Sequence, residues 1–206
     1  LDGDGDRLVM VDQLGRIADG DQLLYVIASD RKRAGTLQGP VVGTVMSNLG
    51  LEQKLQAEGV EFLRAKVGDR YVLAMLKEHG GVLGGETSGH LLCLDRTTTG
   101  DGLISSLEVL AVMKRTGRPL AELVAGMPKF PQVMINVRVR ERIDPSQSQV
   151  IQDAVRRVEK VLGSTGRVVL RASGTEPVIR VMIEAEDEAV ASRYAGELAE
   201  VVRTAI

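Results

Sequence analysis

Short apolar runs alternate with segments of helical spacing over residues 8–117, and this rhythm constrains the fold more than any other feature of the sequence. The run 8–11, which ends at Asp12, is expected to be a buried strand. Alternation of strands and helices is typical of an α/β layer structure. Further strands are expected at 41–46 and 60–68, a glycine-rich turn between two apolar runs at 82–95, and helices at 19–33, 47–59, 69–81 and 101–117.

The alternation of strands and helices ends at "GMPKFPQ", residues 126–132, where two prolines in four residues are typical of a linker. Beyond it we expect a smaller α+β domain, because two strands joined by the tight turn "GTEP" are normally antiparallel. Asp144 before Pro145 is a typical helix start. The strands are expected at 133–139, 167–173 and 178–185, and the helices at 145–163 and 187–206.

Composition limits the class of partner. The chain has 26 Lys and Arg against 28 Asp and Glu, so its net charge of -2 gives no general attraction to nucleic acid or to an anionic membrane. Aromatic residues make up 2% and Trp is absent, which leaves few platforms for stacking. No apolar stretch reaches the roughly 20 residues of a membrane span. Cys93, the one cysteine, is expected to be buried and inert, and we expect a cytoplasmic protein.

The first polar loop is "DGDGDR". Alternating side chains share one face of an extended segment, so Asp2, Asp4 and Asp6 are expected to converge on a hard cation such as Mg²⁺ or Ca²⁺. A solvated acidic turn is the alternative. An EF-hand loop does not fit, because it needs Gly and Glu where this chain has Arg7 and Gln13. Arg7 beside the carboxylates favours a site that an anion such as phosphate approaches.

The second polar loop is "GGETSGH", in which glycines present Glu86, Ser88 and His90 on a compact turn. An acceptor, a hydroxyl and an imidazole suit the vicinal hydroxyls of a sugar. An ordinary β-turn is the alternative, and a lone histidine beside an apolar run is more often structural than catalytic. His79 is expected to be only a charge at a helix C-terminus.

The third polar loop is "RASGTEPVIR", in which Arg171 and Arg180 flank a turn with two hydroxyls and several backbone N–H groups. Two guanidinium groups beside such a turn indicate a phosphate clamp. A hairpin turn with surface arginines is the alternative, and the carboxylate of Glu176 must point away from a phosphate or pair with an arginine. The three loops together predict a phosphorylated sugar held with a divalent metal.

These loops, in this order, resemble those of the α-D-phosphohexomutases, and the resemblance runs along essentially the whole chain. Together with "KVGDRYV" and "TTTGDGL", the sequences of these loops are most similar to those of bacterial members that act on glucosamine phosphates. The resemblance implies an isomerase that interconverts glucosamine 6-phosphate and glucosamine 1-phosphate, through a phosphoserine and a bisphosphorylated intermediate, on the route to peptidoglycan precursors. A mutase of glucose or mannose phosphates, and a sugar-phosphate-binding module without catalysis, remain as alternatives.

The resemblance also implies roles for particular residues. Arg7 would lie beside the phosphoserine, and His90 is a candidate proton carrier. Mg²⁺ is the implied cofactor. Its ligands would be Asp2, Asp4 and Asp6; the sugar would contact Glu86 and Ser88, with Lys66 and Arg70 lining the cleft; and the phosphate that is not transferred would contact Arg171, Ser173, Gly174, Thr175 and Arg180.

The catalytic serine of the family stands in a motif around Ser-His-Asn, and no serine of this sequence has such neighbours. We therefore expect the C-terminal part of a mutase, inactive alone, whose partners include the missing N-terminal domains. The expected division is a remnant of the second mutase domain at 1–38, a mixed-sheet α/β third domain at 39–128, and at 129–206 an α+β fourth domain with helices on one face of an antiparallel sheet. A homodimer is left open.

Overall fold

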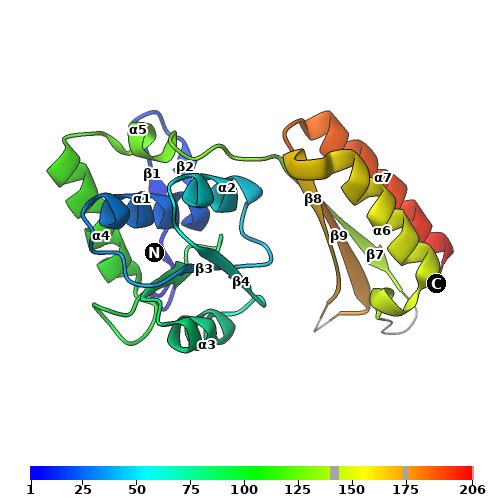
Figure 1. Ribbon diagram of the computed structural model, residues 1–206, viewed down its shortest axis with the longest axis horizontal. Coiled ribbons are helices and arrows are strands. Elements are labelled where there is room, and N and C mark those ends of the chain that lie inside the picture. The colour runs from blue at the N-terminus through cyan, green and yellow to red at the C-terminus, as the bar shows by residue number, and fades with distance from the viewer. Residues whose placement is uncertain (140–143, 174–175, 206) are drawn as a thin grey trace. The chain divides into compact units, whose positions relative to one another are not determined.

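A computed structural model describes residues 1–139, 144–173 and 176–205. The chain forms two compact units, Leu1–Lys129 and Phe130–Ile206 (Figure 1). They divide inside the proline-containing segment 126–132. The expected limits of the three mutase domains stay predictions.

The first unit is built on a four-stranded sheet. Its strands are β3 (Val41–Thr44), β4 (Phe62–Ala65), β5 (Leu83–Gly85) and β6 (Leu91–Cys93), in the order β4-β3-β5-β6. β3 is parallel to β4 and β5, whereas β6 is antiparallel to β5. The carboxyl ends of β3, β4 and β5 therefore lie at one edge of the sheet, where α/β proteins commonly bind ligands.

Helices cover both faces of this sheet (Figure 1). On one face, Val41 and Leu83 pack into an aliphatic core with α1 (Gly20–Arg33), α2 (Leu49–Ala57), α4 (Gly102–Thr116) and α5 (Leu120–Val124). On the other face, Val42 and Leu92 pack against α3 (Asp69–His79). This alternation in β3, one side chain to each layer, follows from the two-residue period of a strand.

The segment 8–11 is not the buried strand that its composition suggests. Only β1 (Met10–Val11) is strand, and it pairs with β2 (Ile17–Ala18) in a hairpin. Leu8 is buried, but Val9 and Val11 are 52% and 61% exposed. Because successive side chains of an extended segment point to opposite faces, a surface hairpin that buries Leu8 leaves Val9 and Val11 in solvent.

The second unit is a three-stranded antiparallel sheet with two long helices on one face (Figure 1). The strands β7 (Gln132–Arg138), β9 (Val178–Ala185) and β8 (Gly166–Ala172) lie in that order. The helices are α6 (Gln149–Leu162) and α7 (Glu188–Thr204), and two short 3₁₀ segments, η1 (Pro145–Gln147) and η2 (Gly163–Thr165), flank α6. This confirms the fold class, a mixed-sheet α/β unit followed by a smaller α+β unit.

The structure differs from the expected elements at two more places. The helix expected over 145–163 is divided at Ser148, whose extended backbone ends η1 before α6 begins. The helix α5 was not expected, because five residues are too few to display a helical period. Within the described residues, no helix combines the length and apolarity required to cross a membrane.

Candidate active site

The acidic loop at the start of the chain brings its three carboxylates together. One oxygen each from Asp2, Asp4 and Asp6 lies within 4.8 Å of the other two. The loop is bent rather than extended, and Gly5 has a φ of 76° that other residues rarely adopt. Ligands about 2.1 Å from one Mg²⁺ lie at most about 4.2 Å apart, so small rotations of these side chains would fit the ion.

The pKa values of two carboxyl groups in this loop, Asp6 and Asp2, are shifted in opposite directions. Desolvation raises the pKa of Asp6; nearby His90 opposes this rise, and the carboxylates of Asp4 and Asp2 add to it. Desolvation acts in the same sense on Asp2, but the backbone N–H of Arg7, 3.1 Å from Oδ1, a hydrogen bond with the side chain of Asp6 and the charge of Arg7 together leave the pKa of Asp2 below its usual value. The Nε atom of Arg7 lies 3.7 Å from Asp2 and 3.9 Å from Asp6, and because one guanidinium cannot balance three crowded carboxylates, the cluster suits a divalent ion.

The acidic loop packs against the expected sugar loop through backbone contacts. Arg7 and His90 form an isolated antiparallel bridge, and the N–H of Leu8 donates to the carbonyl of Gly89 at 3.0 Å. A side chain at position 89 would come within 2.0 Å of that part of the backbone, at the carbonyl oxygen of Leu8. Only a glycine therefore permits this approach.

His90 is enclosed where these loops meet. It is 6% exposed, and its Nε2 atom lies 3.8 Å from Oδ2 of Asp6 and has no hydrogen-bond partner in the described part of the chain. The backbone of Gly100 lies against the ring, because a Cβ there would be 1.7 Å from Nε2. An imidazole beside a carboxylate, with a free ring nitrogen, is suited to transfer a proton.

Glu86 links the expected sugar loop to the next loop along the sheet edge. Its Oε1 atom accepts a hydrogen bond of 2.9 Å from the N–H of Gly68, the residue that precedes α3. Ser88 in the same loop is exposed. The loop therefore presents one carboxylate that is already partly engaged and one hydroxyl that faces solvent.

The expected cleft residues Lys66 and Arg70 are both exposed and both lie near Tyr71. The Lys66 Nζ atom is 6.0 Å from the centre of the ring, and the Arg70 guanidinium is 4.5 Å from it. Lys66 follows the carboxyl end of β4, as Glu86 follows that of β5. The parallel sheet thus gathers these polar groups at the same edge.

The expected phosphate clamp lies in the second unit. Arg171 and Arg180 face each other across β8 and β9, and the Nε atom of each is buried without a hydrogen-bond partner among the described residues. The carboxylate of Glu176 lies 3.6 Å from Arg180. Ser173 is buried and its hydroxyl accepts from the N–H of Glu176 at 3.3 Å. Two expected clamp residues, Gly174 and Thr175, lie outside the described residues.

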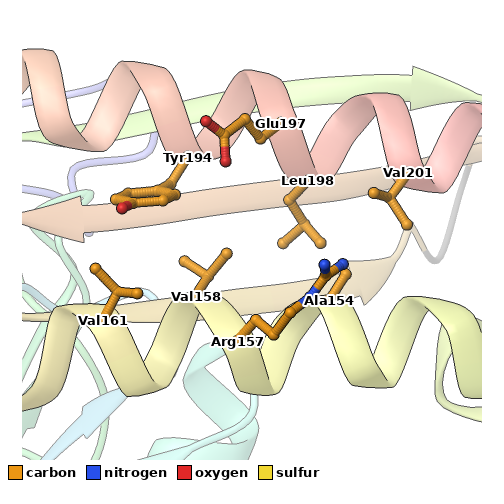
Figure 2. Close-up of a pocket in the computed structure, with 8 residues that line it drawn as sticks. All are labelled: Ala154, Arg157, Val158, Val161, Tyr194, Glu197, Leu198 and Val201. Atoms are coloured by element: carbon orange, nitrogen blue, oxygen red, sulfur yellow. The ribbon is translucent and has the colours of Figure 1, made fainter.

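A groove between α6 and α7 has a different character (Figure 2). Most of its lining is aliphatic, with one arginine and one glutamate at its sides. None of the residues expected to bind sugar, phosphate or metal lines it. The lining residues are Ala154, Arg157, Val158, Val161, Tyr194, Glu197, Leu198 and Val201.

One residue that holds these loops, Asp21, is not recognisable from the sequence. Asp21 is fully buried and accepts hydrogen bonds from the hydroxyl of Thr87 at 2.8 Å and from the N–H of Asn48 at 2.9 Å. From its position alone, Asp21 could be one more acidic residue at the start of the first helix. Its actual partners are 27 and 66 positions away, beyond any local pattern.

Comparison with family models decides the family. The phosphoglucomutase/phosphomannomutase α/β/α domain III matches residues 19–130, and the C-terminal domain of the same family matches residues 134–201. The chain belongs to the phosphoglucomutase/phosphomannomutase family. Its two units correspond to the last two domains named in that family.

Curated relatives of this family are much longer than the chain. Phosphoglucosamine mutase of Alkalilimnicola ehrlichii is 57% identical over 205 residues, which are 100% of this chain and 46% of the relative. Phosphoglucosamine mutase of Methylococcus capsulatus is 56% identical over 97% of this chain and 45% of the relative. The chain thus spans about half the length of the curated relatives it matches.

Solved structures share the fold. N-acetylphosphoglucosamine mutase of Aspergillus fumigatus, solved with GlcNAc-6P and magnesium, has a TM-score of 0.82 at 23% identity, over 98% of this chain and 51% of that one. A phosphoglucomutase/phosphomannomutase family protein of Burkholderia thailandensis has a TM-score of 0.79 at 26% identity, over 100% of this chain and 46% of that one.

Proposed function

We propose that this chain is the C-terminal part of a phosphoglucosamine mutase, which interconverts glucosamine 6-phosphate and glucosamine 1-phosphate. The observation that carries the proposal is the junction of Leu8 with Gly89, by which the carboxylate loop packs against the hydroxyl-presenting loop at the edge of the sheet. Relatives more than 50% identical over nearly the whole chain carry that name.

Within the first unit, each polar group has a chemical task. Asp2, Asp4 and Asp6 hold Mg²⁺, which when bound neutralises charge on a phosphoryl group in transfer. The guanidinium of Arg7 adds a fixed positive charge for the same phosphoryl group. His90, next to Asp6, moves the proton of the sugar hydroxyl that attacks or leaves.

The remaining groups hold the sugar phosphate. Glu86 and Ser88 bind sugar hydroxyls, and Lys66 and Arg70 line the approach. In the second unit, Arg171, Ser173 and Arg180, together with Gly174 and Thr175, bind the phosphate that is not transferred. Fixing the remote phosphate orients either substrate isomer for reaction and lowers the entropy lost in the transition state.

The phosphoryl donor is a phosphoserine of the protein. It passes its phosphoryl group to one sugar oxygen, and the bisphosphorylated sugar then returns its other phosphoryl group to the serine. We assign this serine to the part of the relatives that the present chain does not match, so that the 206 residues alone are inactive. The partners are then the N-terminal domains and a hexosamine phosphate, and the compartment is the cytoplasm, where such a phosphoprotein serves peptidoglycan synthesis.

A chimera tests this function. The matching 46% of the Alkalilimnicola ehrlichii relative is replaced by residues 1–206, and turnover of glucosamine 6-phosphate is measured with Mg²⁺ and a hexose bisphosphate activator. We expect turnover by the chimera and none by residues 1–206 alone. A chimera that folds, as shown by circular dichroism, but converts no hexose phosphate would contradict the proposal.

A second candidate is a mutase of glucose or mannose phosphates, favoured by the phosphoglucomutase/phosphomannomutase models that match both units. The two functions differ by an amine in place of a hydroxyl at C2, which changes few contacts. Competition among glucosamine, glucose and mannose 6-phosphates on the same chimera separates them, because kcat/KM ranks the substrates directly.

A further inference from the structure

Asp21 is a buried carboxylate that its own helix does not need. Asp19 is the N-cap of α1 and forms a capping box with Gln22, so the start of the helix is already satisfied. Asp21, in the first turn, is 0% exposed and turns its Oδ2 atom to other segments instead. Its Oδ1 atom has no hydrogen-bond partner in the described residues.

The partners of Asp21 belong to two loops at the carboxyl edge of the sheet. Asn48 follows β3 and is the N-cap of α2, and Thr87 follows β5 in the middle of the loop 86–90. The hydroxyl of Thr87 donates to Oδ2 at 2.8 Å, and the N–H of Asn48 donates to the same atom at 2.9 Å. The carboxylate of Asp21 therefore links the start of α1 to the start of α2 and to the loop that follows β5.

The backbone around Thr87 is held by a separate contact with the start of α1. The N–H of Gly20 donates to the carbonyl of Thr87 at 3.1 Å, and a Cβ at position 20 would lie 2.1 Å from the carbonyl oxygen of Glu86. Gly20 therefore holds the backbone of Thr87, and Asp21 holds its hydroxyl. Glu86 and Ser88, its neighbours in the chain, are placed with it.

Keeping a carboxylate at this position opposes folding. Desolvation raises the pKa of Asp21 to about 6, against the opposing hydrogen bonds of Asn48, Thr87 and Ser47. Asp19 is the charged neighbour that adds to the rise, and its own carboxylate is paired with Lys129 at 2.6 Å. Ionisable groups whose pKa is strongly shifted by burial cluster at functional sites.

We propose that Asp21 is a positioning residue, which holds Thr87 so that Glu86 and Ser88 present the geometry needed to bind a hexose. The inference rests on the proposed function for the identity of the ligand, but not for the order of the loop. A charged acceptor makes a stronger hydrogen bond to a hydroxyl than a neutral one, which is the physical reason for a carboxylate here.

Amide hydrogen exchange on residues 1–206 tests the order of the loop without any ligand. We expect the exchange rates of the Gly20 and Gly89 amides to rise about tenfold in Thr87→Val and in Asp21→Ala, and less in Asp21→Asn, which keeps an acceptor. Thr36→Val is the matched control, because the hydroxyl of Thr36 donates to the carbonyl of Arg31, five positions away in its own segment. Unchanged rates in Thr87→Val and Asp21→Ala would overturn the inference.

Kinetics on the chimera test the consequence for binding. We expect KM for the hexose phosphate to rise about tenfold in Thr87→Val, with a smaller change in kcat, and Asp21→Asn to retain part of the affinity. Raised exchange rates with an unchanged KM would overturn the positioning role. A wild-type chimera without turnover would count against the proposed function, while the exchange rates would still decide whether Asp21 orders the loop.

Discussion

Arg171 on β8 and Arg180 on β9 lie directly opposite each other in the antiparallel ladder, with both Nε atoms buried and unpartnered among the described residues. Like charges in opposite positions of a sheet destabilise it unless an anion lies between them. Desolvation, and after it the charge of Arg180, lowers the pKa of Arg171, which agrees with two cations forced together.

Inorganic phosphate is therefore expected to stabilise the chain. Its melting temperature should rise with phosphate concentration, because a ligand that binds only the folded state stabilises it. Arg171→Met should raise the melting temperature without phosphate and remove most of the response to phosphate. Arg203→Met on α7 is the matched control, since Arg203 is exposed and pairs with Glu200. The same phosphate response in Arg171→Met and in wild type would refute the clamp.

The acidic loop is expected to bind a divalent cation weakly in the isolated chain. Paramagnetic Mn²⁺ reports this binding by electron paramagnetic resonance, and Mg²⁺ should compete for the site. Asp4→Asn should weaken Mn²⁺ binding by about tenfold, because affinity depends on the number of charged ligands. Asp153→Asn, at an exposed position on α6, should leave binding unchanged. If both variants bind Mn²⁺ as wild type does, the three carboxylates do not form the site.

Gly100→Ala is expected to displace the His90 ring. A Cβ at position 100 would overlap the imidazole, and forcing extra volume into a packed region destabilises by about 1–3 kcal/mol. The imidazole signals in nuclear magnetic resonance spectra should shift for His90 and not for His79, the other histidine. Gly196→Ala, in open space on α7, should leave both signals in place. An unmoved His90 signal in Gly100→Ala would contradict the contact.

The burial of Asp21 predicts a particular dependence of stability on pH. Because the pKa of Asp21 is raised to about 6 in the folded state, the folded protein holds a proton between about pH 4 and pH 6 that the unfolded protein has released. Stability is then lost as the pH rises from about 4 through about 6, by about 3 kcal/mol for a shift of this size. Thermal unfolding across this range should show the loss in wild type and not in Asp21→Asn.

Asp12 provides a control of opposite sign. Despite desolvation, the backbone N–H groups of Arg16 and Leu14 lower the pKa of Asp12, so its contribution to stability is present above its unfolded pKa and is lost as the pH falls. Relative to wild type, Asp12→Asn should therefore lose the most stability at neutral pH. If Asp21→Asn and Asp12→Asn show the same trend with pH, the burial of Asp21 is not the cause.

Local sequence signals predicted the elements that depend on neighbouring residues. Asp101 caps α4 through the N–H of Ile104, and Gly80 and Gly117 end their helices in the left-handed conformation. The antiparallel pair β8 and β9 followed from its short turn. The hairpin of β1 and β2 was missed, because a two-residue strand has no period to detect.

The candidate site was predicted less completely, because its contacts join distant segments. The sequence singled out Glu86 for sugar binding, but only the fold shows that its carboxylate also bonds the N–H of Gly68 before α3. Likewise, "GDGL" gave no sign that Gly100 supports the ring of His90. Gly89 and Gly100, which stand in turn-like sequences, are required by close packing between loops.

The sequence by itself determined the order of strands and helices and the residue types of the three polar loops, since periodicity, capping and turn residues act over a few positions. Only the tertiary structure decided that Asp19 caps α1 while Asp21 bonds Asn48 and Thr87. The two aspartates stand two positions apart in one short acidic run, and they differ because the packing of the sheet buries one of them beneath the loops.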